Sequence, residues 1–238
     1  DFEYYDDLIL GFGFNSYYED IATDSTASSQ QQKLKGSYFD NFVSLSLDYD
    51  KRNQKFQTSQ GFRNYFSTDL PIVSETNTLA STFITTNYYE YFNKYILKSS
   101  FYFKNSNTIT GENIKLSERL SLPSNRLRGF ERGKIGPKDG NDFIGGNYVA
   151  SLNFSSDVPK LLENSQTTDL IIFLDIANVW GVDYDSNLEK SDDIKSAVGI
   201  GLDWFTPIGP LNFTLSQPLS KGSNDITESF RFNLGTTF

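Results

Sequence analysis

The stretch that decides the fold class alternates apolar side chains with small or polar ones: Ala197-Val198-Gly199-Ile200-Gly201-Leu202-Asp203-Trp204. A period of two is that of a β-strand with one apolar face and one polar face. Comparable stretches lie at 8–15, 43–50, 148–155, 211–216 and 229–238, with less regular ones at 62–70, 81–92, 95–104 and 169–180. The sequence therefore predicts about ten strands of roughly 9–12 residues and no helix of comparable strength.

The length of these segments favours a membrane-spanning array. Strands of about ten residues with one apolar face are typical of transmembrane β-barrels, whereas strands of soluble proteins are usually nearer 5–6 residues. Aromatic residues near the predicted strand ends are typical of the girdles at membrane interfaces. These residues are Tyr17, Tyr18, Tyr88, Tyr89, Tyr91, Trp180 and Trp204. A soluble β-sandwich has the same alternation and is the alternative on pattern alone, but the prediction is an all-β, antiparallel transmembrane barrel.

Composition excludes several classes of function. The chain has 238 residues, no Cys and no His, which removes thiol nucleophiles, disulfides, His-based triads and the usual zinc sites. A net charge of −9 makes nucleic acid an unsuitable partner. The acidic stretch 183–189 begins like a calcium loop, but Leu188 occupies the position that requires Gly. We therefore expect no enzyme, no cofactor and no metal site.

Two connections are long for a regular array of strands. Residues 20–37 are mostly polar and are predicted to form a solvated loop. Residues 105–141 lack a convincing strand, and loops of that length are usually functional or disordered. This second loop carries a basic cluster in an acidic chain: Arg126, Arg128, Arg132 and Lys134. A loop that folds inward, into an acidic barrel lumen, explains the cluster.

Within that loop, Leu127-Arg128-Gly129-Phe130 followed by Ile135-Gly136-Pro137 resembles the Arg-Gly-Phe loop of the BamA-like outer-membrane β-barrel assembly superfamily, the bacterial surface antigen family. The family usually has Val where Leu127 stands. Further stretches follow in the family's order: 145–148, 173–180, 196–211 and 230–238. The resemblance covers about residue 38 to the end and is densest after residue 120.

The resemblance implies that residues 1–238 are the C-terminal part of an outer-membrane barrel domain, with its POTRA modules and first strands absent. They would supply about the last ten strands of a sixteen-stranded barrel in a bacterial (Gram-negative) outer membrane. The implied function is to fold and insert β-barrel clients. Implied partners are unfolded clients, the lipid bilayer and accessory lipoproteins bound through the periplasmic modules. The alternatives are a two-partner secretion transporter of the same superfamily and a passive porin.

Three sets of residues form the predicted site. The loop motif is Leu127, Arg128, Gly129, Phe130, Ile135, Gly136 and Pro137. Asp175 lies on the opposite face of its strand from Leu170, Ile172, Leu174 and Ile176. A buried carboxylate requires a partner; it either faces a wet lumen or, as the resemblance implies, pairs with Arg128 as a latch. The terminal strand is implied to act as a recognition signal through Phe230, Phe232, Leu234, Gly235 and Phe238.

Overall fold

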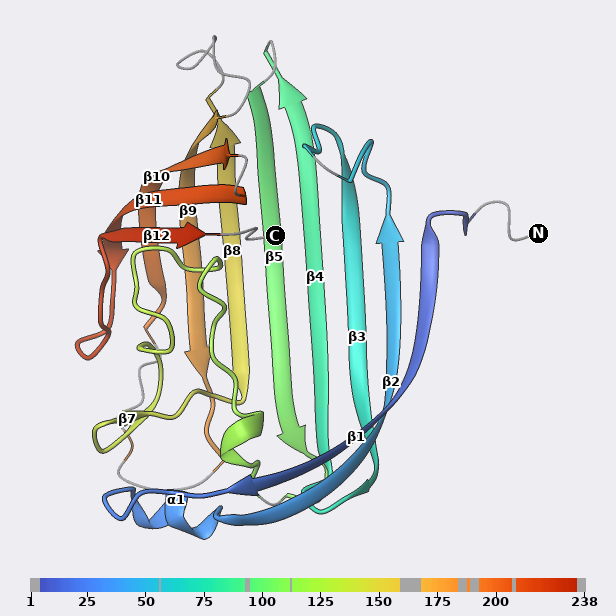
Figure 1. Cartoon of the computed structure of the whole chain (residues 1–238), viewed down its shortest axis with the longest axis vertical. Coiled ribbons are helices and arrows are strands. Elements are labelled where there is room, and N and C mark those ends of the chain that lie inside the picture. Colours follow the sequence, from blue (N-terminus) through green and yellow to red (C-terminus); the bar gives the residue numbers. More distant parts are fainter. Residues whose placement is uncertain are drawn as a thin grey trace.

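A computed structural model describes residues 5–55, 57–92, 95–111, 113–158, 168–183, 188, 193–206 and 209–234. It contains one ten-stranded antiparallel sheet and a separate two-stranded hairpin (Figure 1). The ten strands are β1 (Leu8–Ile21), β2 (Gly36–Asp50), β3 (Gly61–Ser74), β4 (Thr78–Tyr91), β5 (Tyr95–Thr108), β8 (Tyr148–Asp157), β9 (Thr168–Trp180), β10 (Lys195–Thr206), β11 (Gly209–Ser220) and β12 (Phe230–Leu234). The all-β, antiparallel prediction is therefore confirmed.

The strands follow one another in sequence order across the sheet, so every connection joins neighbours. The sheet is open in the described part of the chain, because β1 and β12 form its two edges and do not pair with each other. It curves strongly, and residues 109–147 lie against its concave side (Figure 1). We call that side the inner face and the opposite side the outer face.

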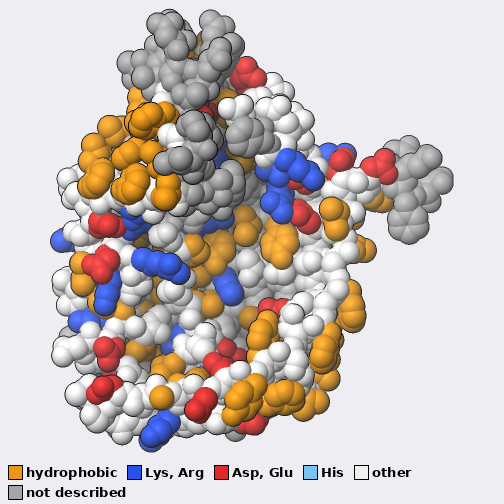
Figure 2. All heavy atoms as spheres, viewed as in Figure 1, with side chains coloured by type: hydrophobic (Ala, Val, Ile, Leu, Met, Phe, Trp, Pro, Cys, Tyr) orange, Lys and Arg blue, Asp and Glu red, His pale blue; other side chains and the backbone are white. Residues whose placement is uncertain are grey.

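Alternation sorts the side chains between these faces, as the period of two predicts. Leu10, Phe12 and Phe14 of β1 are 63–78% exposed on the outer face. In β12, Phe230, Phe232 and Leu234 are also outward and half exposed or more. Apolar side chains therefore line the margin of the sheet, and charged ones gather over the loop (Figure 2). The predicted register of the last strand, with its aromatic residues outward, is confirmed.

The bounds of both predicted long loops differ from those in the structure: the first loop lies at 22–35 instead of 20–37, and the second at 109–147 instead of 105–141. Strand β5 continues to Thr108, and the second loop contains a short hairpin of β6 (Lys138–Asp139) and β7 (Asp142–Phe143). The first loop is not merely solvated, because it contains the helical turn α1 (Ser29–Lys33), capped by Ser28. The Ser28 hydroxyl also donates to Asp139 of the hairpin. These segments are ordered by contacts between loops that lie far apart in the sequence. Such contacts cannot be predicted from local composition.

Strand lengths and aromatic positions also differ in detail from the prediction. Nine of the ten strands have 10–15 residues, so several are longer than expected. Two of the aromatic residues assigned to girdles lie on the inner face. Tyr17 packs there on Phe42, with ring centroids 6.1 Å apart, and the ammonium group of Lys98 lies 5.6 Å from the centre of the Tyr88 ring.

The main apolar core lies between the loop and the inner face. Its loop members are Leu120, Leu122, Leu127, Phe130 and Ile135, and its sheet members are Tyr102, Val149, Ala177, Val179 and Ala197. Besides the turn α1, the described part contains the 3₁₀ turn η2 (Leu116–Glu118). Neither helix is long and apolar enough to cross a bilayer. The loop is therefore a packed element that gives the inner face its core.

Gly199 of β10 leaves room for the close packing of Phe173 on the inner face, and a substitution there tests this packing. A Cβ atom there would lie 2.2 Å from the carbonyl oxygen of Leu215 and 2.5 Å from the Phe173 ring. We expect Gly199→Ala to destabilise the intact protein by about 1–3 kcal/mol through overpacking, measured by urea unfolding in detergent micelles. Gly13→Ala is the control, because its Cβ would meet only Ser44 Cβ, at 3.6 Å. Equal effects of the two substitutions would contradict the packing argument.

Candidate functional site

The centre of the site is an ion pair between the loop and strand β9. Arg128 Nε lies 2.7 Å from Asp175 Oδ2, and one terminal nitrogen of Arg128 lies 2.8 Å from Oδ1. The planar guanidinium thus meets the carboxylate in the two-pronged geometry for which arginine is suited. The structure places the predicted pair in contact; its action as a latch stays a prediction.

Asp175 is fully buried, and further donors complete its shell. The backbone N–H of Arg128 donates to Oδ2 at 3.0 Å, and the Asn153 side chain donates to Oδ1 at 2.8 Å. Asn153 also donates to the carbonyl oxygen of Arg126, at 2.7 Å. The Arg128 guanidinium lies 3.4 Å from the centre of the Phe173 ring, which adds a cation–π contact. The carboxylate is therefore neutralised, hydrogen-bonded and shielded, and the wet-lumen alternative for it is not what the structure shows.

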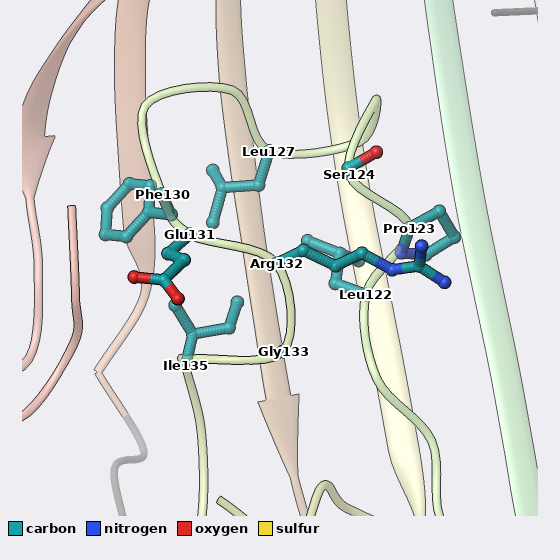
Figure 3. Close-up of a pocket in the computed structure, with 9 residues that line it drawn as sticks. All are labelled: Leu122, Pro123, Ser124, Leu127, Phe130, Glu131, Arg132, Gly133 and Ile135. Atoms are coloured by element: carbon teal, nitrogen blue, oxygen red, sulfur yellow. The ribbon is translucent and has the colours of Figure 1, made fainter. Parts of the chain in front are cut away.

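The residues after Arg128 fit the loop tightly to the sheet. Gly129 has φ +90°, and a Cβ there would lie 3.1 Å from the Cβ atoms of Ala197 and Ser216. Phe130 is 2% exposed. Its side chain and those of Leu122, Leu127 and Ile135 surround a small space within the loop (Figure 3). At position 129 glycine is therefore needed both for the positive φ and for the close approach of the loop to Ala197 and Ser216.

The second half of the motif lies against the same wall. Ile135 and Pro137 are buried, and the carbonyl of Pro137 accepts from the backbone N–H of Ile144 at 3.1 Å. Gly136 has φ +90°, and a Cβ there would lie 2.9 Å from Val179 Cβ. All seven predicted loop residues are thus brought together on β9 and its neighbours, where they shape the loop.

Other basic residues of the loop also have partners on the inner face. Arg126 donates to the Ser100 hydroxyl at 2.8 Å and lies over the Tyr102 ring at 5.0 Å. Burial lowers the pKa of its guanidinium, although the neighbouring Tyr102 opposes this. Arg132, by contrast, is exposed. Within the basic cluster, Arg126 and Arg128 therefore hold the loop to the sheet, whereas Arg132 faces solvent.

A second ionic anchor was missed by the sequence reasoning. Lys115, whose side chain is 3% exposed, donates to Glu19 of β1 and Asp40 of β2 and lies 3.6 Å from Glu118. Glu118 in turn accepts from the Thr78 hydroxyl at 2.7 Å. The signal was faint: one lysine in a polar stretch, and two carboxylates that alternation places on the inner face. Only the curvature of the sheet brings them together.

Two pKa shifts follow from this second anchor. Burial alone lowers the pKa of the Lys115 ammonium, but its hydrogen bonds to Asp40 and Glu19 outweigh burial and raise it. Burial raises the pKa of the Glu118 carboxyl, against the hydrogen bond from Thr78 and the charge of Lys115. Since the folded-state pKa of Lys115 is raised, its contribution to stability is complete below the unfolded pKa, about 10.4. The contribution is lost as pH rises through the folded value.

Of the predicted residues of the terminal strand, the structure describes three. Phe230, Phe232 and Leu234 line the outer face of β12, and the rings of Phe232 and Phe213 lie 5.0 Å apart. Gly235 and Phe238 lie outside the described residues. In the acidic stretch 183–189, which we did not expect to bind metal, residues 184–187 and 189 also lie outside them. Asp183 accepts from the Arg119 side chain and, at 2.7 Å, from the backbone N–H of Ile114.

Comparison with known protein families shows to which family this chain belongs. A profile of the Omp85 superfamily domain matches residues 2–238. The chain belongs to the Omp85 superfamily. It is 26% identical over 244 residues to the outer membrane protein assembly factor BamA of Neorickettsia risticii, covering 98% of this chain and 32% of that protein. The BamA of Neisseria meningitidis serogroup B is 28% identical over an alignment of 139 residues, and the match covers 47% of this chain and 17% of the relative.

The superfamily also includes a eukaryotic relative. A SAM50-like protein of Schizosaccharomyces pombe is 32% identical over an alignment of 144 residues, and the match covers 55% of this chain and 29% of that one. Among solved structures, BamA from Haemophilus ducreyi lacking POTRA domains 1–3 superposes with a TM-score of 0.77 at 20% identity, covering 94% of this chain and 50% of that one. This Omp85 chain thus has the fold of half of that protein and spans less than a third of the curated relatives.

Removing the charge of Asp175 tests the first anchor. We expect Asp175→Asn to destabilise the intact protein by about 3 kcal/mol, since it leaves a largely buried guanidinium without its counter-charge. Urea unfolding in detergent micelles measures this. The control is Asp48→Asn, because Asp48 pairs with Arg63, whose side chain is 43% exposed, and a pair that is partly in water contributes about 1 kcal/mol or less. A cost at Asp175 no larger than at Asp48 would refute the anchor.

Lys115→Gln tests the second anchor. It leaves Asp40, whose side chain is 1% exposed, without its cation, so we expect the arm around residues 109–118 to detach more often. Limited proteolysis of the intact protein in micelles should cut this arm about tenfold faster, as a loss of roughly 1.4 kcal/mol in local stability implies. Lys134→Gln is the control, since Lys134 contacts the Phe143 ring and has no carboxylate partner among the described residues. Unchanged cleavage would show that Lys115 does not hold the arm.

Proposed function

We propose that this Omp85 chain is the barrel region of an outer-membrane protein assembly factor, in a bacterial outer membrane, that folds and inserts β-barrel clients. The observation that carries the proposal is the inward loop held through Arg128 and Asp175 beside strand β12. The similarity to BamA proteins across nearly the whole chain supports it. Periplasmic modules that recruit accessory lipoproteins belong to the same proposal.

The physical basis of assembly is the chemistry of strand edges. In lipid, an unpaired edge leaves backbone N–H and C=O groups without partners, at a cost of several kcal/mol each. A barrel that opens beside its terminal strand can offer those groups to an incoming strand. Strand β12 pairs with β11 along one edge and with no described strand along the other. The work comes from the client's own folding, and we propose a non-enzymatic mechanism without a cofactor.

The inner face argues against a passive pore. Residues 109–147 cross it and place an apolar core where a porin keeps a water-filled channel. The core and its two ionic anchors give this Omp85 barrel a structured interior. A structured interior is suited to controlling barrel shape rather than to conducting solutes.

A charge swap in the intact protein tests the function. We expect Arg128→Glu and Asp175→Arg each to lower the yield of folded client barrel about tenfold or more, because like charges would face each other at a buried site. The double variant should recover part of that loss. The assay is complementation in cells depleted of the wild-type protein, with client folding read from heat-modifiable gel mobility.

The matched control swaps Arg63 and Asp48, a pair on the same inner face that does not involve the loop. Its single and double variants should assemble clients at wild-type yield. Single variants at 128 and 175 that fold and still assemble clients normally would refute the proposed function of the loop.

A further inference from the structure

Strand β12 lies at one edge of the sheet in the described part of the chain. Its described residues pair with β11 from Leu215–Phe230 to Leu211–Leu234. No strand pairs with its other edge among the described residues. Its outward side chains, Phe230, Phe232 and Leu234, remain 50–66% exposed. Contacts on its inner face therefore add to the β11 ladder in holding the strand.

Arg231 provides those inner contacts. Its guanidinium donates to the carbonyl oxygen of Ser124 at 2.8 Å and to that of Phe130 at 2.6 Å. Its Nε donates to Glu228 at 2.8 Å, which balances the charge. The side chain is 13% exposed. The carbonyls of Ser124 and Phe130 lie on either side of the turn that contains Arg128. The planar guanidinium of Arg231 therefore binds both ends of that turn.

The segment before β12 also joins the loop, through its backbone. The N–H of Glu228 donates to the carbonyl of Gly129 at 3.0 Å, and the N–H of Glu131 donates to that of Ile226 at 2.9 Å. Phe130 and Thr227 form an isolated antiparallel bridge. The loop motif is therefore hydrogen-bonded both to the β11–β12 connection and to β12 itself.

We propose that Arg231 is a positioning residue that couples the terminal strand to the inward loop, so that release of the loop from Asp175 loosens β12. Arg128 binds the loop to β9 through its side chain, and Arg231 binds β12 to the same turn. Displacement of the turn thus removes two of the acceptors that hold the strand. The inference deepens the proposed function, on which it rests for its consequence in client assembly.

Hydrogen–deuterium exchange of the intact protein in lipid nanodiscs tests the contact without any client. In Arg231→Gln, amides of residues 230–234 should exchange about fivefold faster or more. Arg231→Lys, which keeps the charge and loses the fork, should give an intermediate increase and carries the test should the Gln variant not fold. Arg63→Gln, which removes an inner-face arginine that does not touch the loop, should leave β12 unchanged. Wild-type exchange in both Arg231 variants would overturn the proposal.

Coupling is read from a double-mutant cycle. Arg128→Gln should speed exchange of β12 about threefold or more in the wild-type background and hardly at all in Arg231→Gln. Equal acceleration in both backgrounds would overturn the coupling, and a purely structural role of Arg231 would produce that result. Failure of the proposed function looks different, because exchange would remain coupled while the charge-swap variants at 128 and 175 still assembled clients normally.

Discussion

The carboxylate of Asp175 is the constraint on which the rest of this site depends. It projects from β9 among Phe173, Ala177 and Val179 and has no exposure to solvent. An isolated buried charge of this kind is too costly to persist, so a donor set must come to it. The loop brings that set: the side chain and the backbone N–H of Arg128, with Asn153 as the neighbour from the wall. The position of the loop follows from this requirement.

From Arg128 the loop extends in both directions across the inner face. Toward β1 and β2 it ends in Lys115, neutralised by Glu19 and Asp40. Toward β11 and β12 it is held by backbone pairing and by Arg231. Polar and ionic contacts therefore hold the two ends of the loop, and the apolar core packs its middle against the sheet. The anchors are therefore joined by a continuously packed element.

The outer face obeys the opposite constraint. Its large apolar side chains are exposed within this chain, which suits a surface that faces hydrocarbon. The pleat links the two faces, because a shift of one residue in β12 would exchange its aromatic residues with Arg231. The same alternation that suits the sheet to a bilayer thus fixes which side chains can reach the loop.

Alternation is local, so the strands and their faces could be predicted from the sequence: 230–234 and 211–216 have only one register that turns apolar residues outward. A basic loop and a carboxylate on an inward position each required a partner, and the resemblance to the superfamily implied that Arg128 pairs with Asp175. Three contacts could be seen only in the folded chain: the anchor at Lys115, the packing of α1 against Asp139 and the hydrogen bonds of Arg231 to Ser124 and Phe130. These contacts join residues 75 to 111 positions apart, and the curvature that brings them together is a property of the whole sheet.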